Sequence, residues 1–249
     1  MKILGIIPAR FESSRFPGKP LADIAGKSMI QRVYDQCLKS ASLDRLIVAT
    51  DDFRILEHVK GFGGDAVMTA DHHKSGTDRC NEVATLFPQF DICINIQGDE
   101  PMIDPLQIDL LCGCFQDESA ELATLIKKIT LQNELFNPNT PKVIIDKDME
   151  AVYFSRSTIP FLRNVNQDNW LDHHTFYKHI GIYGYRSSIL SEIAKLAVST
   201  LEKAESLEQL RWLENGYKIK VAITEMESQA IDTPGDLQDL LAQLNQAPL

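Results

Sequence analysis

Three cations, Arg10, Arg15 and Lys19, lie within ten residues of one another near the start of the chain. They follow an apolar run, Ile3–Ile7, that breaks at Pro8. A buried strand followed directly by a cationic loop is how α/β enzymes hold a polyphosphate at the carboxyl end of a strand. Because like charges repel unless they share an anion, this loop is predicted to bind a triphosphate or pyrophosphate. A solvated basic turn is the alternative, and the loop matches neither the Walker loop nor GxGxxG.

Carboxylates follow a second apolar stretch, Ile92–Gln97, which leads through a glycine to Asp99. Aspartates at the carboxyl end of a strand suit magnesium, which takes one or two protein carboxylates together with phosphate oxygens and water. The alternative is a β-turn, since Gly-Asp shortly before proline is good turn chemistry. Farther along, Asp232 directly precedes the expected start of a helix at Pro234. Alone it would serve as a helix cap, whereas beside Asp99 it would be a second magnesium ligand.

The segment Lys74–Arg79 is small and polar, and Ser75 opens a predicted capping box at a helix start. Backbone N–H groups at such a terminus suit the recognition of a base or a carboxylate. Arg79, on the first turn, would pair with a substrate carboxylate. A surface salt bridge to Asp78 or Glu82 is the alternative, and the sequence alone scarcely separates the two.

A further polar pattern occupies residues 178–186, which alternate as in a strand. One face is predicted to carry His179, Gly181, Tyr183 and Tyr185. Such a face would suit a hydroxyl-rich sugar, or it is simply a half-exposed strand face. Glu208, at the start of an amphipathic helix, is an ordinary surface residue by pattern alone.

Strand-length apolar runs alternate with helical patterns, as expected of an α/β fold. Strands are expected at residues 3–8, 45–50, 66–69, 92–97, 122–128, 142–146, 151–154, 179–186 and 219–224. Helices are expected at residues 29–39, 53–60, 77–87, 106–115, 187–196, 207–215 and 234–245, the last opened by a Thr233–Asp236 capping box. Residues 137–186 interrupt this rhythm, and we predict that they form an inserted sheet within one compact domain, serving the second substrate or a dimer interface.

The composition is that of an ordinary globular protein of 249 residues with a formal charge of −10. This acidity argues against a general nucleic-acid binder. Five cysteines without CxxC spacing indicate free thiols and a reducing cytoplasm. No stretch is apolar enough for a membrane span, and the first apolar run is too short for a signal peptide.

Several motifs occur together in a fixed order: IPARFESSRFPGKPL, SGTDR, NIQGDEPMI, FNPN, HIGIYGYR, LEQLR and IDTP. This series, from about residue 3 to 237, resembles the 3-deoxy-manno-octulosonate (Kdo) cytidylyltransferases, or CMP-Kdo synthetases. The resemblance implies a single Rossmann-like nucleotidyltransferase domain, residues 1–249, with a mostly parallel central sheet, helices on both faces and a small inserted sheet. It also implies transfer of CMP from CTP to the anomeric hydroxyl of Kdo for lipopolysaccharide biosynthesis, a magnesium requirement and a homodimer.

The resemblance also assigns roles to individual residues. Arg10 and Lys19 would clamp the triphosphate with Arg15 nearby, Pro8, Ala9 and Ser75 would lie near the cytidine, and Asp99 and Asp232 would hold magnesium. The positions that surround Kdo in this family are Arg79, Gln97, His179, Tyr183 and Glu208. Four motif positions carry residues other than those frequent in the family, namely Phe11, Phe16, Ser28 and Gly235. These differences leave the fine specificity for the sugar open. The alternatives are a cytidylyltransferase for 8-amino-Kdo or sialic acid, and a non-catalytic nucleotide-binding protein.

Overall fold

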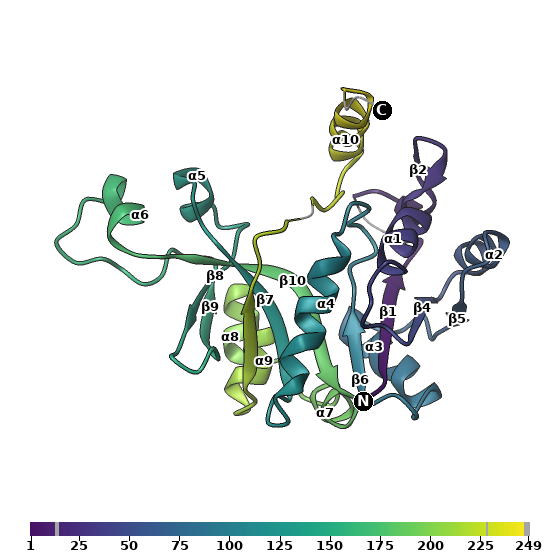
Figure 1. The fold of residues 1–249 in the computed structure, drawn as a ribbon, viewed down its shortest axis with the longest axis horizontal. Coiled ribbons are helices and arrows are strands. Elements are labelled where there is room, and N and C mark those ends of the chain that lie inside the picture. Colours follow the sequence, from purple (N-terminus) through teal and green to yellow (C-terminus); the bar gives the residue numbers. More distant parts are fainter. Residues whose placement is uncertain (13–14, 228, 247–249) are drawn as a thin grey trace. The chain divides into compact units, whose positions relative to one another are not determined.

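The computed structural model of this protein describes residues 1–12, 15–227 and 229–246, so Ser13 and Ser14 of the cationic loop lie outside the described residues. The chain divides into two compact units (Figure 1). Unit 1 comprises Met1–Asp109 and Glu227–Leu249, and unit 2 comprises Leu110–Met226. The predicted insertion at residues 137–186 lies wholly in unit 2. That the whole chain forms a single domain stays a prediction.

Unit 1 is built on four parallel strands in the order β6-β1-β4-β5. Their bounds are β1 Ile3–Ala9, β4 Arg45–Thr50, β5 Ala66–Met68 and β6 Ile92–Asn95. All of β6 and all of β1 except Pro8 are buried. Strands that are apolar and buried on both faces are those of a parallel sheet covered by helices on both sides. The predicted α/β class is therefore confirmed.

The helices of unit 1 begin at marked caps. Ser28 Oγ accepts a hydrogen bond from the Gln31 N–H (3.2 Å) at the start of α1, and Ser75 forms the predicted capping box of α3. The remaining elements include a 3₁₀ turn η1 and a short antiparallel hairpin β2–β3. Their bounds are η1 Lys19–Leu21, β2 Asp23–Ile24, β3 Lys27–Ser28, α1 Met29–Cys37, α2 Phe53–Gly61, α3 Gly76–Leu86 and α10 Pro234–Gln246, with α4 (Pro105–Gly113) running across the unit boundary.

Unit 2 has a mixed sheet in which β7 pairs parallel with β11 and antiparallel with β10. A second antiparallel series joins β10 to β8 and β8 to β9. The strands are β7 Leu122–Lys128, β8 Lys142–Ile145, β9 Ala151–Ser155, β10 Tyr177–Arg186 and β11 Ile219–Ile223. The helices are η2 Cys114–Gln116, α5 Gln132–Leu135, η3 Gln167–Asn169, α6 Trp170–His173, α7 Ser187–Ile193, α8 Thr200–Glu205 and α9 Gln209–Glu214.

All nine expected strands and all seven expected helices are present, with small shifts at their ends. The sequence analysis missed the β2–β3 hairpin, the short helices α5, α6 and α8, and the 3₁₀ turns. Among the described residues, no helix combines the length and the apolar composition that crossing a bilayer demands.

Candidate active site

Two aspartates far apart in the sequence meet at one lysine. Lys19 Nζ lies 2.7 Å from Asp99 Oδ2 and 3.5 Å from Asp232 Oδ1, and Arg15 Nη2 lies 3.0 Å from the same Asp232 oxygen. We call Arg15, Lys19, Asp99 and Asp232 the charged cluster. The Lys19 side chain is only 14% exposed, whereas that of Arg15 is 64% exposed. All four residues belong to unit 1, and the predicted proximity of the two carboxylates is confirmed.

The loop that carries Lys19 is fixed by backbone hydrogen bonds and by packing. Gly18 takes a left-handed conformation (φ +73°), and its N–H donates to the Phe11 carbonyl at 2.8 Å. Only glycine adopts this conformation without cost, so the turn before Lys19 depends on it. Phe16 packs against a buried cluster of Ile24, Met29, Ile231 and Leu240, which includes side chains from both sides of Asp232. The same core therefore anchors the cationic loop and the segment that bears Asp232.

The backbone around Asp99 contacts the backbone of two other segments. Its carbonyl oxygen accepts a hydrogen bond from the Ile231 N–H at 2.9 Å, which ties the strand end to the residue before Asp232. A Cβ on the preceding Gly98 would lie 2.9 Å from the Pro8 carbonyl oxygen. This turn can therefore lie against the end of β1 only because residue 98 has no side chain.

The cap of α10 is Thr233. Its Oγ1 accepts from the Asp236 N–H (3.3 Å), and Asp236 Oδ2 accepts from the N–H groups of Thr233 (2.7 Å) and Asp232 (2.9 Å). These hydrogen bonds, above all those from the backbone, lower the pKa of Asp236. The predicted Thr233–Asp236 capping box is confirmed. Because Thr233 fills the capping role, the carboxylate of Asp232 faces the cations instead.

The donor set of the charged cluster fits magnesium. One ammonium group contacts an oxygen from each carboxylate, so both carboxylates lie near enough to face a single cation. Among the residues that the structure describes, no group of three or more His, Cys, Asp and Glu side chains is placed to hold a metal. Two carboxylates are nevertheless the usual protein share for magnesium bound together with a nucleotide.

The residues predicted to lie near cytidine gather at the ends of β1 and β6. Ser75 Oγ accepts from the Asp78 N–H at 3.1 Å, which caps α3. A Cβ on Gly76 would lie 3.3 Å from Asn95 Nδ2 and 3.7 Å from Pro8 Cγ. The amino end of α3 therefore lies directly against Pro8, and Ala9 follows it, buried in β1. This places Pro8, Ala9 and Ser75 together, and their contact with a nucleotide stays a prediction.

Arg10 has partners outside the charged cluster. Its Nη2 donates to the His73 carbonyl. Burial and the neighbouring Arg79 charge lower the pKa of Arg10. Arg10 also lines a polar pocket of ≈ 360 Å³ at the carboxyl ends of β1 and β4, together with Phe11, Glu12, Asp51, Asp52 and Asp71. The predicted clamp is thus divided, with Lys19 and Arg15 on the carboxylates and Arg10 beside this pocket.

Arg79 is fully buried in unit 1. Its Nη2 lies 2.6 Å from Asp51 Oδ2, and its Nη1 donates to Thr69 Oγ1. The alternative of a surface salt bridge to Asp78 or Glu82 is therefore wrong in its partner and in its exposure. Within the described ranges, Nε of Arg79 is buried and has no hydrogen-bond acceptor. Gln97 lies just beyond β6 and is half-buried. Sugar contacts of Arg79 and Gln97 stay predictions.

In unit 2, alternate residues of β7 are paired with three residues of β10. Opposite Ile126, Thr124 and Leu122 lie His179, Tyr183 and Tyr185, which therefore share one face. Gly181 and Ile182 have no partner in β7 because the register shifts there in a β-bulge. The prediction of one shared face is thus confirmed for His179, Tyr183 and Tyr185, and the simple alternation is wrong at the bulge.

Aromatic rings form a continuous row along this face. Between ring centroids, His179 lies 5.3 Å from Phe154 and 5.2 Å from Tyr183, and Tyr183 lies 5.1 Å from Trp212. We call Phe154, His179, Tyr183, Tyr185 and Trp212 the aromatic row. Burial lowers the pKa of His179 to about 3. Burial, followed by the neighbouring Tyr185 and the charge of Glu208, raises the pKa of Tyr183 well above its usual value. His179 and Tyr183 are therefore uncharged at neutral pH.

Glu208 stands at the cap position of α9. Its charge acts on Tyr183, so it lies near the aromatic row as the family resemblance implies. The sequence analysis missed three functional neighbours: Thr124 beside His179, Trp212 beside Tyr183, and Asp51 beside Arg79. Thr124 alone had a visible signal, since it is a polar residue within the apolar run Leu122–Ile126.

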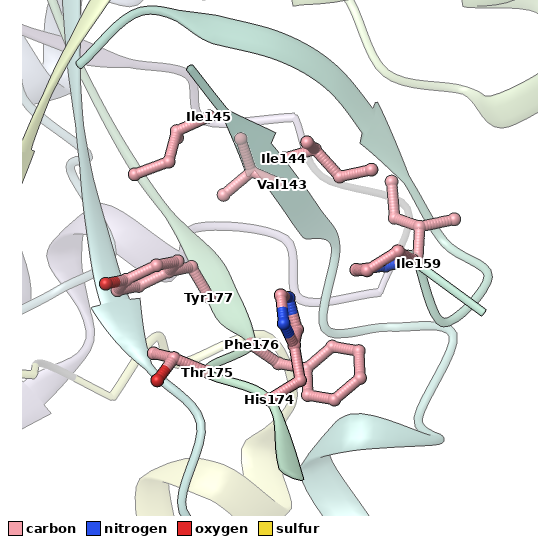
Figure 2. Close-up of a pocket in the computed structure, with 9 residues that line it drawn as sticks. Val143, Ile144, Ile145, Ile159, His174, Thr175, Phe176 and Tyr177 are labelled. Carbon is pink, nitrogen blue, oxygen red and sulfur yellow. The ribbon is translucent and has the colours of Figure 1, made fainter. Parts of the chain in front are cut away.

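A second pocket, of ≈ 140 Å³, lies in unit 2 and is apolar (Figure 2). Its walls come from β8, from the cis Ile159–Pro160 bond and from the segment that leads into β10. The lining residues are Val143, Ile144, Ile145, Ile159, Pro160, His174, Thr175, Phe176 and Tyr177. None of the residues predicted to bind substrate lines this pocket.

Comparison with known proteins points to one activity. The family described as cytidylyltransferase matches residues 4–219. A 3-deoxy-manno-octulosonate cytidylyltransferase from Parabacteroides distasonis is 57% identical over 247 residues, which cover 97% of this chain and 98% of that protein. One from Bacteroides thetaiotaomicron is 56% identical over 242 residues, 96% of each chain. A solved structure of CMP:2-keto-3-deoxy-manno-octonic acid synthetase complexed with CTP matches with a TM-score of 0.91 at 43% identity, covering 99% of both chains.

Proposed function

The chain belongs to the cytidylyltransferase family, among the 3-deoxy-manno-octulosonate cytidylyltransferases, and we propose that it transfers CMP from CTP to the anomeric hydroxyl of Kdo. The products are CMP-Kdo and pyrophosphate. The observation that carries the proposal is the charged cluster, in which Lys19 joins Asp99 to Asp232. These residues come from distant parts of the sequence and meet beside the carboxyl ends of the parallel strands, where α/β enzymes bind their nucleotides.

The reaction is an in-line displacement, in which the anomeric oxygen of Kdo attacks the α-phosphorus of CTP and pyrophosphate leaves. Positioning and charge neutralisation dominate such transfers. Asp99 and Asp232 would hold magnesium, which when bound supplies a Lewis acid for the phosphate and hydroxyl oxygens. Lys19 and Arg15 offset the negative charge that builds on the departing pyrophosphate. The hydroxyl proton passes to solvent water as the new P–O bond forms, so we assign no protein general base.

The nucleotide is assigned to unit 1. Arg10 binds a phosphate oxygen beside the polar pocket that it lines. Pro8 and Ala9, at the end of β1, and Ser75, at the amino end of α3, frame the cytidine. The positive end of the α3 dipole and its backbone N–H groups favour an electronegative ligand there.

The sugar acid is assigned to the face that bears His179, Tyr183 and Glu208 in unit 2. These side chains combine neutral ring edges with one carboxylate, which suits a ligand rich in hydroxyl groups. The family resemblance also assigns Arg79 and Gln97, which lie in unit 1, to Kdo. The guanidinium of Arg79 is wholly buried against Asp51.

The setting of the reaction is part of the proposal. We place the enzyme in the cytoplasm and its product in lipopolysaccharide biosynthesis. The five free cysteines, four of them buried, support a reducing compartment. The homodimer is what the family resemblance implies, and we place Phe161 in its interface, because this side chain is 72% exposed and packs on the buried Trp170. Replacing Phe161 with Asp should shift sedimentation from dimer to monomer, and an unchanged dimer would contradict this assignment of the interface.

The activity is tested by pyrophosphate release with CTP and magnesium. Parallel reactions contain Kdo, 8-amino-Kdo, N-acetylneuraminate or no sugar. We expect release only with Kdo. Release with another sugar acid instead would keep the reaction type and change the acceptor. No release with any sugar, from folded protein that still binds CTP, would contradict catalysis and favour a binding role.

A further inference from the structure

Thr124 is a buried hydroxyl at the centre of unit 2 that the proposed reaction does not use. It is fully buried in β7, opposite the β-bulge of β10. Its Oγ1 lies 2.7 Å from the Ile182 carbonyl oxygen, 3.2 Å from the Ile180 carbonyl oxygen and 3.0 Å from His179 Nε2. One hydroxyl group therefore meets three polar atoms, two of which accept hydrogen bonds and never donate them.

The single hydroxyl proton determines the state of the histidine. A threonine hydroxyl donates one hydrogen bond and accepts others. The two carbonyl oxygens are acceptors only, so the proton points toward them, with the 2.7 Å contact to Ile182 the better placed. Oγ1 is then an acceptor toward His179, and Nε2 of the ring must carry a proton. A neutral imidazole has one N–H, so Nδ1 keeps a free lone pair.

The ring is also held in place. The ring of Phe154 meets the imidazole edge-on, with 81° between the ring planes. The ring of Tyr183 lies on it at an interplanar angle of 40°. The part of the chain that the structure describes supplies no hydrogen bond to Nδ1. The imidazole is half-buried, so Nδ1 is left for a ligand.

We propose that Thr124 is a positioning residue, which fixes His179 as the Nε2–H tautomer so that Nδ1 accepts a hydrogen bond from a hydroxyl of the sugar acid. The proposal rests on the proposed function, which places His179 in the sugar site. It has a consequence for recognition. A neutral ring whose only N–H is engaged by Thr124 has no proton to offer a carboxylate, so His179 reads a hydroxyl of Kdo and not its carboxylate.

The tautomer can be measured in the wild-type protein. We would record ¹⁵N spectra of the six histidines and assign His179 from the signal that disappears in His179→Gln. The expected result is a protonated Nε2 and an unprotonated Nδ1 at neutral pH, with Nδ1 shifting on addition of Kdo. A protonated Nδ1 would overturn the proposal, and because no residue is changed in the measured protein, misfolding cannot obscure the answer.

Kinetics test the role of the hydroxyl. Thr124→Val keeps the shape of the side chain and removes its hydrogen bonds, and Thr124→Ser is the matched control that restores them. We expect Val to raise KM for Kdo about tenfold, the size of one good hydrogen bond, with KM for CTP changed less than about twofold. Ser should return KM for Kdo close to the wild-type value. Equal KM values for Kdo in wild type and Thr124→Val would contradict the proposal.

Substrate analogues separate this inference from the proposed function. We would use four analogues of Kdo, each lacking one hydroxyl group, at C4, C5, C7 or C8. For one of these analogues, Thr124→Val should cause no further rise in KM, because the hydroxyl that His179 recognises is already absent. If Thr124→Val raises KM for every analogue as much as it does for Kdo, His179 accepts a hydrogen bond from none of these hydroxyls and the inference fails. Failure of the proposed function would look different, because wild-type protein would then release no pyrophosphate with Kdo at all.

Discussion

The charged cluster of unit 1 and the aromatic row of unit 2 differ in how they carry charge. In the charged cluster, two carboxylates and two cations balance one another, and the outermost of them, Arg15, is 64% exposed. In the aromatic row, His179 and Tyr183 are half-buried and neutral, as the pKa values of these two side chains indicate. On the proposed function, charge is kept where phosphates would react, and hydrogen-bond direction is set where a sugar would be recognised.

This difference reflects the two ligands. A triphosphate changes its charge distribution during transfer, so cations held in place and a metal site stabilise it most. A sugar hydroxyl is neutral and needs a donor or acceptor at a fixed place. A half-buried, uncharged histidine provides an acceptor that replaces the hydrogen bond to water which the hydroxyl loses. Substitutions in the two regions should therefore differ in which kinetic constant they change and by how much.

The largest effect is expected from Asp99→Asn in the charged cluster. Removing one of two carboxylates weakens the magnesium site, and kcat should fall by about 10²–10³-fold. The Tm should change little, because Asp99 lies at the edge of the core and its backbone carbonyl keeps the hydrogen bond from the Ile231 N–H. Turnover measured with Asp65→Asn provides the control, since Asp65 pairs only with Arg45 among the described ion pairs. Near-normal kcat in Asp99→Asn would remove the metal role.

The next effect separates the two cations of the charged cluster. Lys19→Met should lower kcat/KM for CTP about 10²-fold, because Lys19 lies between both carboxylates and is nearly enclosed. Arg15→Met should cost only a few-fold and should lose that effect in high salt, since Arg15 is exposed and screened. Equal losses of kcat/KM for CTP in the two variants would show that burial does not determine how much each cation contributes.

A smaller effect concerns the cap that frees Asp232 for the charged cluster. Thr233→Ala removes the side-chain cap of α10 and should lower the free energy of unfolding by about 1 kcal/mol, or Tm by roughly 2–4 °C. Thr233→Ser retains the cap and should melt like the wild type. Thermal unfolding by circular dichroism measures both, and an unchanged Tm in Thr233→Ala would show that Asp236 alone suffices.

The smallest effect belongs to the aromatic row and depends on pH. An unfolded histidine takes a proton near pH 6.5, whereas the pKa of folded His179 is lowered to about 3 by burial. Stability from this group is therefore present above pH 6.5 and is lost as pH falls toward 3. Between pH 6.5 and 5.5 the loss is at most about 1 kcal/mol. His179→Gln should show a flatter fall of Tm over that range, and a parallel fall in both proteins would contradict the burial of a neutral ring.

Local signals in the sequence predicted most of the fold. The apolar runs predicted every strand except β2 and β3, and the caps at Ser75 and Thr233 marked two helix starts. The same signal existed for α8, where Ser199 and Glu202 form a capping box, but it was not used. The β2–β3 hairpin escaped because Ala25 occupies a left-handed position (φ +48°) that glycine or asparagine usually fills.

The features that were not predicted depend on contacts between distant residues. The one-turn helix α6 exists because Trp170 packs against Phe176 and Phe161, which no local pattern encodes. The bulge in β10 adds two residues and so keeps the alternation of His179 and Tyr183, which hides it from a periodicity argument. Likewise, the burial of Arg79 beside Asp51 joins α3 to the end of β4, and neither residue reveals its partner.

Unit 1 is discontinuous, since its strands come first in the sequence and Asp232 returns to it only after the whole of unit 2. A ribosome therefore completes the aromatic row before it has made the second carboxylate of the charged cluster. A nascent chain, or one released early by a damaged message, would carry the side chains that we assign to the sugar while lacking Asp232. Such products are expected to be catalytically silent and to consume no CTP, so the order of residues ties the onset of activity to nearly complete synthesis.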